Sequence, residues 1–338
     1  MSELLINAHA LDGLRALRDE SFDVCVTSPP YFGMRNNRVR PVEWPGARLG
    51  ACLLEAHAWV RDEQPRTKNA RQGSTEVVKN PRLTVVPPPN PGEVCAHCGA
   101  WRGELGQEPR VSLYASHLVR VFDGVRRALK PSGSLWLVLG DSYAGSGGSG
   151  GDYWPGGSRE GQARVGRREP SGALKAKDLC GVPWAVALAL RDAGWFLRSA
   201  IVWNKPGACL NWGPDRPTSG YEFVFYFSKT AHPFYRDVRT VGDGTCRMRD
   251  VWTIPTEPYK GAHYSTFPRA LVRRILSLAL PVGGNALDPF VGTGTTLLVA
   301  RELAPQGAHV GIELNADYVK QAQERPLLPP LGVLFEYP

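Results

Sequence analysis

The sequence predicts an α/β fold with a doubly wound, mainly parallel sheet and two irregular insertions. Three observations lead to this prediction: strand-like and helix-like segments alternate at both ends of the chain, short apolar runs end in turn-forming residues, and two long stretches break the alternation. The chain has 338 residues, of which 43% are hydrophobic, so it can form one large domain with insertions or two domains.

The expected elements follow one another in a regular order. A helix over 11–17 leads into a strand over 22–26, and an amphipathic helix over 113–129 leads, through a Lys-Pro-Ser-Gly turn, into a strand over 134–139. A helix over 182–193 precedes strands over 195–203 and 221–228. The last part predicts helix, strand, helix, strand and helix over 268–280, 285–288, 295–303, 309–313 and 315–323.

Two regions interrupt this order. Residues 35–110 are rich in Pro, Arg and Gly, show little periodicity and are too long for a plain connection. Residues 144–177 open with a Gly-rich run, which predicts a flexible basic loop, either solvated or in contact with a polyanion. Its basic residues are Arg159, Arg164, Arg167, Arg168, Lys175 and Lys177.

Composition favours a polyanionic partner such as nucleic acid. The net charge is +8 and the pI is about 9.2, although a basic excess of this size also occurs on solvated surfaces. The seven cysteines are an odd number, no secretory signal opens the chain, and no apolar run approaches the roughly 20 residues that span a bilayer. We therefore expect a cytoplasmic protein with reduced thiols.

A glycine-containing stretch after the strand at 285–288 predicts a cofactor loop. Gly292 and Gly294 let the chain turn tightly, so that backbone N–H groups can approach a ligand at the start of the next helix. No lysine follows the second glycine, unlike the phosphate loop of nucleotide triphosphatases, and Leu297 stands where a dinucleotide fold carries Gly or Ala.

Two acidic residues narrow the ligand of this loop. Asp288 would repel a pyrophosphate but suits a cationic group such as a sulfonium. Glu313, at the end of the next strand, suits the ribose hydroxyls of an adenosine. The cofactor that carries an adenosine and a sulfonium, without a pyrophosphate, is S-adenosylmethionine.

Ser28-Pro29-Pro30-Tyr31, after the strand at 22–26, predicts a pocket for a planar amine. The prolines lack N–H groups and restrict the backbone, so carbonyl oxygens remain free to accept hydrogen bonds. Ser28 supplies another acceptor and Tyr31 a flat face on which a base can stack. Two acceptors would hold the hydrogens of an exocyclic amine and draw the lone pair of its nitrogen towards a methyl donor.

Taken together, the two motifs resemble those of the DNA amino-methyltransferases of the β arrangement, in which the amine motif precedes the cofactor motif. The resemblance implies a Rossmann-like, S-adenosylmethionine-dependent fold forming a single catalytic domain over 1–338, with 35–110 and 144–177 as insertions and 230–262 as the target-recognition segment. Matching segments cover most of the chain, over 26–32, 135–143, 194–206, 216–229, 251–268 and 286–319.

The resemblance also assigns roles to individual residues. Ser28, the Pro29 carbonyl, Pro30 and Tyr31 would hold a flipped base, and Glu313 the cofactor ribose. Many members carry Gly-Asp-Ala upstream, whereas this chain has Ala8-His9-Ala10, so His9 would replace the adenine-reading Asp. The methionine end of the cofactor would be lined by Asp288, Phe290, Gly292, Thr293, Gly294 and Thr295, and closed over by His263, Phe267 and Pro268.

Within this family, Ser at the first motif position is typical of cytosine N4 enzymes and Asp or Asn of adenine N6 enzymes. Ser28 therefore favours cytosine N4, with adenine N6 as the alternative. We expect direct in-line transfer without a covalent enzyme intermediate, because the Pro-Cys motif of C5-cytosine chemistry is absent. A serine hydroxyl is too weak a base at neutral pH, so Asp141 is the candidate proton relay, unless it only caps its loop.

Arginines near both motifs are candidate DNA contacts, although each would equally suit a solvated surface. They are Arg35, Arg38, Arg40, Arg247 and Arg249. The implied partner is double-stranded DNA, with a cognate restriction endonuclease as a further partner, and the protein would be a monomer or homodimer in a prokaryotic cytoplasm, associated with the nucleoid.

The first insertion also carries a candidate zinc site. Cys95-Ala96-His97-Cys98 is followed by Gly99, as in a metal knuckle, and Cys52 and His57 lie upstream. Three cysteines and one histidine would complete a tetrahedral site, with free thiols as the alternative. Two further function classes remain open, a nicotinamide-dependent oxidoreductase, which Leu297 disfavours, and a non-catalytic, zinc-ordered DNA-binding protein.

Overall fold

The computed structural model describes residues 3–33, 41–44, 57–61, 92–144, 173–207, 215–236, 248–257 and 267–325. The chain divides into two compact units. The first consists of Met1–Pro29, Leu118–Gly140 and Val182–Pro338, and the second of Pro30–His117 and Asp141–Gly181. The second unit therefore takes in most of both predicted insertions. That the whole chain forms a single catalytic domain stays a prediction.

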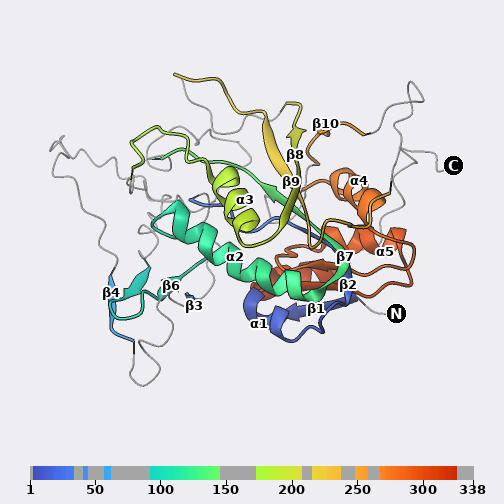
Figure 1. Ribbon diagram of the computed structural model, residues 1–338, viewed down its shortest axis with the longest axis horizontal. Coiled ribbons are helices and arrows are strands. Elements are labelled where there is room, and N and C mark those ends of the chain that lie inside the picture. Colours follow the sequence, from blue (N-terminus) through green and yellow to red (C-terminus); the bar gives the residue numbers. More distant parts are fainter. Residues whose placement is uncertain are drawn as a thin grey trace, which may run out of the picture. The chain divides into compact units, whose positions relative to one another are not determined.

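The first unit contains a large mixed sheet, with eight strands among the described residues (Figure 1). Its strand order is β1-β12-β11-β2-β7-β9-β8-β10, and every neighbouring pair is parallel except those that include β9. This topology confirms the predicted doubly wound, mainly parallel sheet. The strands are β1 (Glu3–Asn7), β2 (Phe22–Thr27), β7 (Leu129–Leu139), β8 (Phe196–Asn204), β9 (Tyr221–Ser228), β10 (Val251–Thr253), β11 (Ala286–Asp288) and β12 (His309–Glu313).

Helices cover this sheet, and α4 lies beside α5 (Figure 1). Every residue of β2 is buried, as expected for a central strand covered on both faces, which explains its mostly apolar sequence. The core includes Trp136 of β7, whose ring stacks on Tyr226 of β9 at 4.3 Å between centroids. The helices are α1 (Ala10–Arg15), α2 (Val111–Ala128), α3 (Val182–Asp192), α4 (Arg269–Ala279), α5 (Thr295–Leu303) and α6 (Ala316–Glu324).

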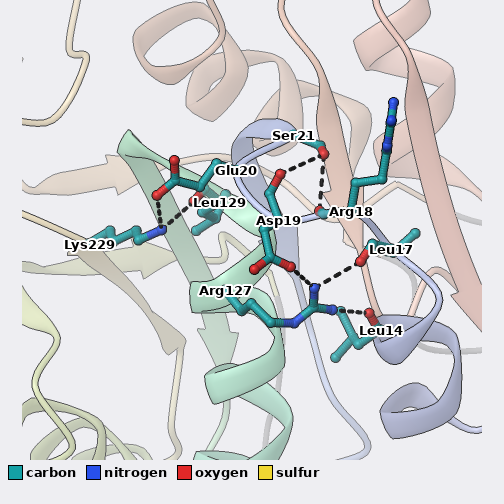
Figure 2. A network of polar contacts seen from close by, with 9 residues as sticks. All are labelled: Leu14, Leu17, Arg18, Asp19, Glu20, Ser21, Arg127, Leu129 and Lys229. Carbon is teal, nitrogen blue, oxygen red and sulfur yellow. Dashed lines mark hydrogen bonds and ion pairs between the residues drawn. The ribbon is translucent and has the colours of Figure 1, made fainter.

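A polar network fixes the edge of the sheet at which β2 and β7 begin (Figure 2). The guanidinium of Arg127, at the end of α2, donates to the Leu17 carbonyl at 2.9 Å and pairs with Asp19. Lys229, after β9, donates to the Leu129 carbonyl at 2.7 Å. These contacts tie the entry of β2 to the start of β7, at the edge opposite the predicted motifs.

The second unit contains a small antiparallel sheet that the sequence did not predict. Its strands are β3 (Val42–Trp44), β4 (Trp59–Arg61), β5 (Glu93–Cys95) and β6 (Trp101–Gly103), in the order β3-β6-β5-β4. The expectation that 35–110 is irregular throughout is therefore wrong. Each strand has three residues, which are too few to show a period-two pattern. The core of this sheet consists of aromatic rings and not of alternating aliphatic residues.

Several predicted boundaries also shift. Strands β1 and β10 were missed, and β7 begins at Leu129, so the expected Lys-Pro-Ser-Gly turn lies inside a strand. A register irregularity between Phe22 and Val24 of β2 accommodates this stretch. The bounds of β9, α5 and β12 agree with the prediction. Over the described part of the chain, we find no helix with the length and apolar character needed to cross a membrane.

Candidate active site

The predicted motifs gather at one edge of the large sheet. Because β1, β2, β11 and β12 are parallel neighbours in the order β1-β12-β11-β2, their carboxyl ends share one edge. His9 follows β1, Ser28 follows β2, Asp288 ends β11 and Glu313 ends β12. Ligand sites of open α/β sheets form at such an edge. The structure thus brings four residues from distant parts of the sequence to the ends of adjacent strands.

Asp288 is the centre of a buried hydrogen-bond cluster that joins β11, β2 and α5. Its Oδ1 accepts from the Thr27 hydroxyl at 2.6 Å and from the Phe290 backbone N–H at 3.0 Å, and its Oδ2 accepts from the Thr296 hydroxyl at 2.7 Å. The side chain is 1% exposed. Burial raises the pKa of Asp288 to about 7, although all three hydrogen bonds oppose that rise. Asp288 therefore holds the loop to its two strands.

The loop itself has the tight turn that its glycines predicted. Gly292 and Gly294 have φ angles of 52° and 84°, in the left-handed region that favours glycine, and Gly294 is the N-cap of α5. The hydroxyl of Thr293 is buried and has no hydrogen-bond partner among the described residues. A buried, unpaired hydroxyl in such a loop is a group that a bound ligand would satisfy. Arg325 donates to the Thr295 hydroxyl at 2.7 Å and so holds the far side of the turn.

Glu313 faces the same loop from the end of β12. Its Oε2 accepts from the Gly292 N–H at 3.0 Å, and its Oε1 accepts from the Asn315 N–H at 2.8 Å. Burial raises the pKa of Glu313. His9 lies at the next strand end, where the Ala8 N–H donates to the Glu313 carbonyl at 3.1 Å. Burial lowers the pKa of His9, which favours a neutral imidazole that can both donate and accept.

The amine motif crosses the boundary between the two units. Ser28 and Pro29 belong to the first unit, and Pro30 and Tyr31 to the second. Within the second unit, the Tyr114 hydroxyl donates to the Pro30 carbonyl at 2.9 Å. That carbonyl is therefore already engaged, which leaves the Pro29 carbonyl and Ser28 as the predicted acceptors for an amine.

Gly106 supports the same turn. The Gly33 N–H donates to the Gly106 carbonyl at 2.8 Å, and a Cβ on Gly106 would lie 2.9 Å from the Tyr31 carbonyl oxygen. Gly106 also has a φ of 90°, so glycine is needed there for both conformation and space. The sequence analysis missed Gly106 and Tyr114. The glycine was a visible turn signal, but nothing in the motif indicates which distant residues touch it.

A buried Glu-His pair holds Gly106 and so also supports the turn at Pro30 and Tyr31. Glu108 accepts from the Gly106 N–H through Oε2 at 2.7 Å, and its Oε1 lies 2.9 Å from His117 Nδ1. Both side chains are almost fully buried. The His117 ring stacks between Trp44 and Trp101, with centroid distances of 4.6 and 5.5 Å. The small sheet is thereby connected to the residues that hold Pro30 and Tyr31.

The structure also places a buried ion pair at the end of β8. Lys205 Nζ lies 2.5 Å from Glu222 and 3.9 Å from the centroid of the Trp203 ring. Burial lowers the pKa of Lys205, and the adjacent Glu222 opposes that shift. The sequence analysis gave this lysine no role in a site, because a Lys-Pro pair after a strand carries no sign of an ion pair.

Asp141 follows β7, whose last residues pair in parallel with β2. Its Oδ1 accepts from the Ser142 N–H at 2.8 Å, which is the loop-capping contact that was the alternative to a proton relay. The relay stays a prediction. Pro268 is buried and is the N-cap of α4, and Arg249 is exposed. Other predicted site residues lie outside the described ranges: Arg35, Arg38, Arg40, Cys52, Arg159, Arg164, Arg167, Arg168, Arg247 and His263.

Comparison with known proteins agrees with this arrangement. A family model described as DNA methylase matches residues 22–324. The type II methyltransferase M.SmaI of Serratia marcescens is 42% identical over 234 residues, covering 67% of this chain and 78% of the relative. The type II methyltransferase M.Cfr9I of Citrobacter freundii is 38% identical over 227 residues, covering 66% of this chain and 74% of the relative.

Two solved structures share the fold. The PvuII DNA methyltransferase, which is cytosine-N4-specific, has a TM-score of 0.58 and 15% identity, and the match covers 96% of this chain and 86% of that chain. A protein of Thermus thermophilus described as a DNA modification methylase, complexed with S-adenosyl-L-methionine, has a TM-score of 0.51 and 19% identity, over 96% and 92% of the two chains. At these identities the likeness concerns the fold alone.

Proposed function

This chain belongs to the DNA methylase family, and we propose that within it the protein is a type II enzyme that methylates the exocyclic N4 of cytosine with S-adenosylmethionine. The observation that carries the choice of base is Ser28, the first residue of the Ser-Pro-Pro-Tyr motif directly after β2. Family membership supports DNA as the substrate. It leaves no place for the nicotinamide-dependent alternative.

The loop after β11 fits an adenosine cofactor with a methionine tail. The buried Thr293 hydroxyl has no partner among the described residues, and Glu313 and His9 sit at the two neighbouring strand ends. Bound S-adenosylmethionine would supply a methyl group activated by its sulfonium. We propose that Glu313 holds the ribose, that His9 contacts the adenine, and that Asp288 positions the loop. The methionine end would be held by Phe290, Gly292, Thr293, Gly294 and Thr295, with His263 and Pro268 closing over it.

The amine motif is proposed to hold a cytosine that has left the duplex. Flipping a base costs a few kcal/mol, which contacts to the base and the phosphates must offset. Ser28 Oγ and the Pro29 carbonyl would accept the two N4 hydrogens, while Tyr31 stacks on the ring. The Pro30 carbonyl accepts from Tyr114, so we assign it to the support of the turn and not to the amine. Holding the two N4 hydrogens in this way draws the nitrogen lone pair out of conjugation with the ring, so that it can attack.

In the transfer step, N4 would form a bond to the methyl carbon as the carbon–sulfur bond of S-adenosylmethionine breaks, S-adenosylhomocysteine would leave, and N4 would then lose one proton. Ser28 orients the amine, because its hydroxyl is too weak a base at neutral pH. We propose that Asp141 passes the proton on to water. If Asp141→Asn retained full turnover in a methyl-transfer assay, while Ser28→Ala lost it, the relay would be wrong and Asp141 would only cap its loop.

The base specificity is tested by direct chemical analysis of the product. Purified protein would be incubated with unmethylated DNA and isotope-labelled S-adenosylmethionine, and the DNA digested to nucleosides for mass spectrometry. We expect labelled N4-methyldeoxycytidine, lost in Ser28→Ala. Labelled N6-methyldeoxyadenosine would overturn the choice of cytosine in favour of the adenine alternative. No label in either base, with no cofactor binding by calorimetry, would favour the non-catalytic DNA-binding alternative.

A further inference from the structure

We propose that His57, Cys95 and Cys98 of the second unit bind a structural zinc ion. Their ligand atoms all lie within 4.8 Å of one another, and Cys98 Sγ lies 3.4 Å from His57 Nδ1. Zinc–ligand distances of about 2.0–2.3 Å in a tetrahedral site place neighbouring nitrogen and sulfur ligands about 3.6 Å apart. Cys98 and His57 are therefore already at the separation that one zinc ion requires, and Cys95 lies close enough to join them with a small side-chain movement.

The backbone around the two cysteines has the form that a zinc knuckle needs. Cys95 ends β5, and the chain turns back to β6 through a Gly99 N–H to Cys95 carbonyl bond of 2.9 Å. Gly99 has a φ of 71°, which lets the turn close. The Ala100 N–H points at Cys98 Sγ, 3.4 Å away. A backbone N–H directed at a cysteine sulfur stabilises the thiolate that binds a metal.

Packing around the site favours an ion over a pair of ordinary buried thiols. The two cysteines are 1% and 5% exposed, yet among the described residues their buried cluster has only Ala100 as a further buried member, with Trp59 packed against it. The larger buried rings of the small sheet, Trp44 and Trp101, stack on His117 instead. A metal that joins His57, just before β4, to the β5–β6 turn would add stabilisation to this part of the sheet.

The ion would support the amine motif through contacts within the second unit. Trp101, the first residue of β6, stacks on His117, and His117 contacts Glu108, which binds the Gly106 N–H. Gly106 in turn holds Gly33 and adjoins the Tyr31 carbonyl. The fourth tetrahedral ligand predicted from the sequence, Cys52, lies outside the described residues and stays a prediction.

Metal content of the full chain tests the proposal without reference to methyl transfer. The untagged protein would be purified without chelators and analysed by elemental mass spectrometry. We expect about one zinc per chain, and its loss in Cys98→Ser. Cys180→Ser is the matched control, because Cys180 is also a cysteine of the second unit outside any disulfide but is not part of the cluster. The control should keep its zinc.

A second measurement covers the case in which Cys98→Ser fails to fold. Wild-type protein loaded with cobalt in place of zinc should show the intense near-ultraviolet band of thiolate-to-cobalt charge transfer. Chelation should lower the melting temperature, and added zinc should restore it. Wild-type protein without zinc and without the cobalt band would overturn the proposal, as would a Cys95–Cys98 disulfide found by mass spectrometry of the native chain.

Discussion

The cofactor loop after β11 and the turn after β2 carry the two motifs of this protein, but different kinds of contact hold them. The cofactor loop is held by contacts within the first unit. Asp288 of its own motif accepts from Phe290, Thr296 and Thr27, while Glu313 and Arg325 contact Gly292 and Thr295. The second part of the amine turn is fixed from outside, by Tyr114 and Gly106 of the second unit.

Because of this difference, cofactor binding and base binding should depend on different parts of the molecule. A loop held within the first unit should keep its shape wherever the large sheet and its helices are kept. A turn held by distant residues depends on an insertion whose contacts have no signature in the motif. Changes in the second unit should therefore damage the handling of the base and leave cofactor binding intact.

The largest effect is expected from Gly106→Ala. The new Cβ would lie 2.9 Å from the Tyr31 carbonyl oxygen and 3.1 Å from the Pro30 carbonyl oxygen, so the turn must move. A displacement of this kind at a reacting group costs about a hundredfold in rate. We expect about a hundredfold lower kcat/KM for DNA in a labelled methyl-transfer assay, with the dissociation constant for S-adenosylmethionine, measured by calorimetry, nearly unchanged.

Gly181→Ala is the matched control for that variant. Gly181 is also in the second unit and has a φ of 68°, so alanine there meets similar backbone strain, but a Cβ would touch nothing within 4 Å. We expect a loss of stability from the backbone strain alone, with little change in kcat/KM. Equal losses of activity in the two variants would show that backbone strain, and not contact with the amine turn, is responsible.

A smaller effect is expected from Asp288→Asn, which changes the residue that holds the cofactor loop. Burial raises the folded-state pKa of Asp288 to about 7 from the ordinary value of 3.8, so its protonated form stabilises the fold. That stability is fully present below the unfolded pKa and is lost as pH rises through the folded pKa of about 7. In Asp288→Asn, the amide cannot titrate, and the Thr296 hydroxyl can turn to the Val26 carbonyl, 3.3 Å away.

We therefore expect the wild type to lose about 2 kcal/mol of unfolding free energy relative to Asp288→Asn between about pH 5 and pH 8. Denaturant unfolding of both proteins at several pH values measures this difference. If unfolding free energy changed with pH in parallel for the two proteins, the buried, titrating carboxyl of Asp288 would be contradicted. That result would also weaken the contrast between a cofactor loop held within the first unit and an amine turn held by the second.

The sequence predicted the parts of the site whose physical cause is local. Gly292 and Gly294 mark a tight turn by composition alone, and the apolar residues of β2 mark a buried central strand, so the edge that carries Ser28, Asp288 and Glu313 was predictable. The small sheet was not, because its strands are too short for a periodic pattern and its core depends on Trp101 stacking on His117 of α2.

The contacts of the amine turn were missed for the same reason. A hydrogen bond between Tyr114 and a carbonyl 84 residues earlier in the chain depends on how α2 is placed, and no motif of either segment records it. Sequence reasoning instead produced an apparently complete pocket from Ser28 to Tyr31. It assigned free acceptors to the turn without being able to tell that the Pro30 carbonyl already has a donor.

The smallest effect is therefore expected from Tyr114→Phe, which removes the hydroxyl that donates to the Pro30 carbonyl and keeps the ring. The hydrogen bond contributes about 1 kcal/mol, so its loss should lower kcat/KM for DNA about tenfold or less. Phe32 packs on the ring at 5.6 Å between centroids and should hold it in place. Binding of S-adenosylmethionine, measured by calorimetry, should stay unchanged.

Tyr226→Phe supplies the control, since Tyr226 is also largely buried but stacks on Trp136 in the large sheet. If the released Pro30 carbonyl became a third acceptor for the amine, Tyr114→Phe would instead tighten the binding of DNA and change its preference between bases. Unchanged activity, equal to that of Tyr226→Phe, would mean that Gly106 alone fixes the turn. A tenfold loss confined to Tyr114→Phe would establish that the second unit sets the geometry in which the base is held.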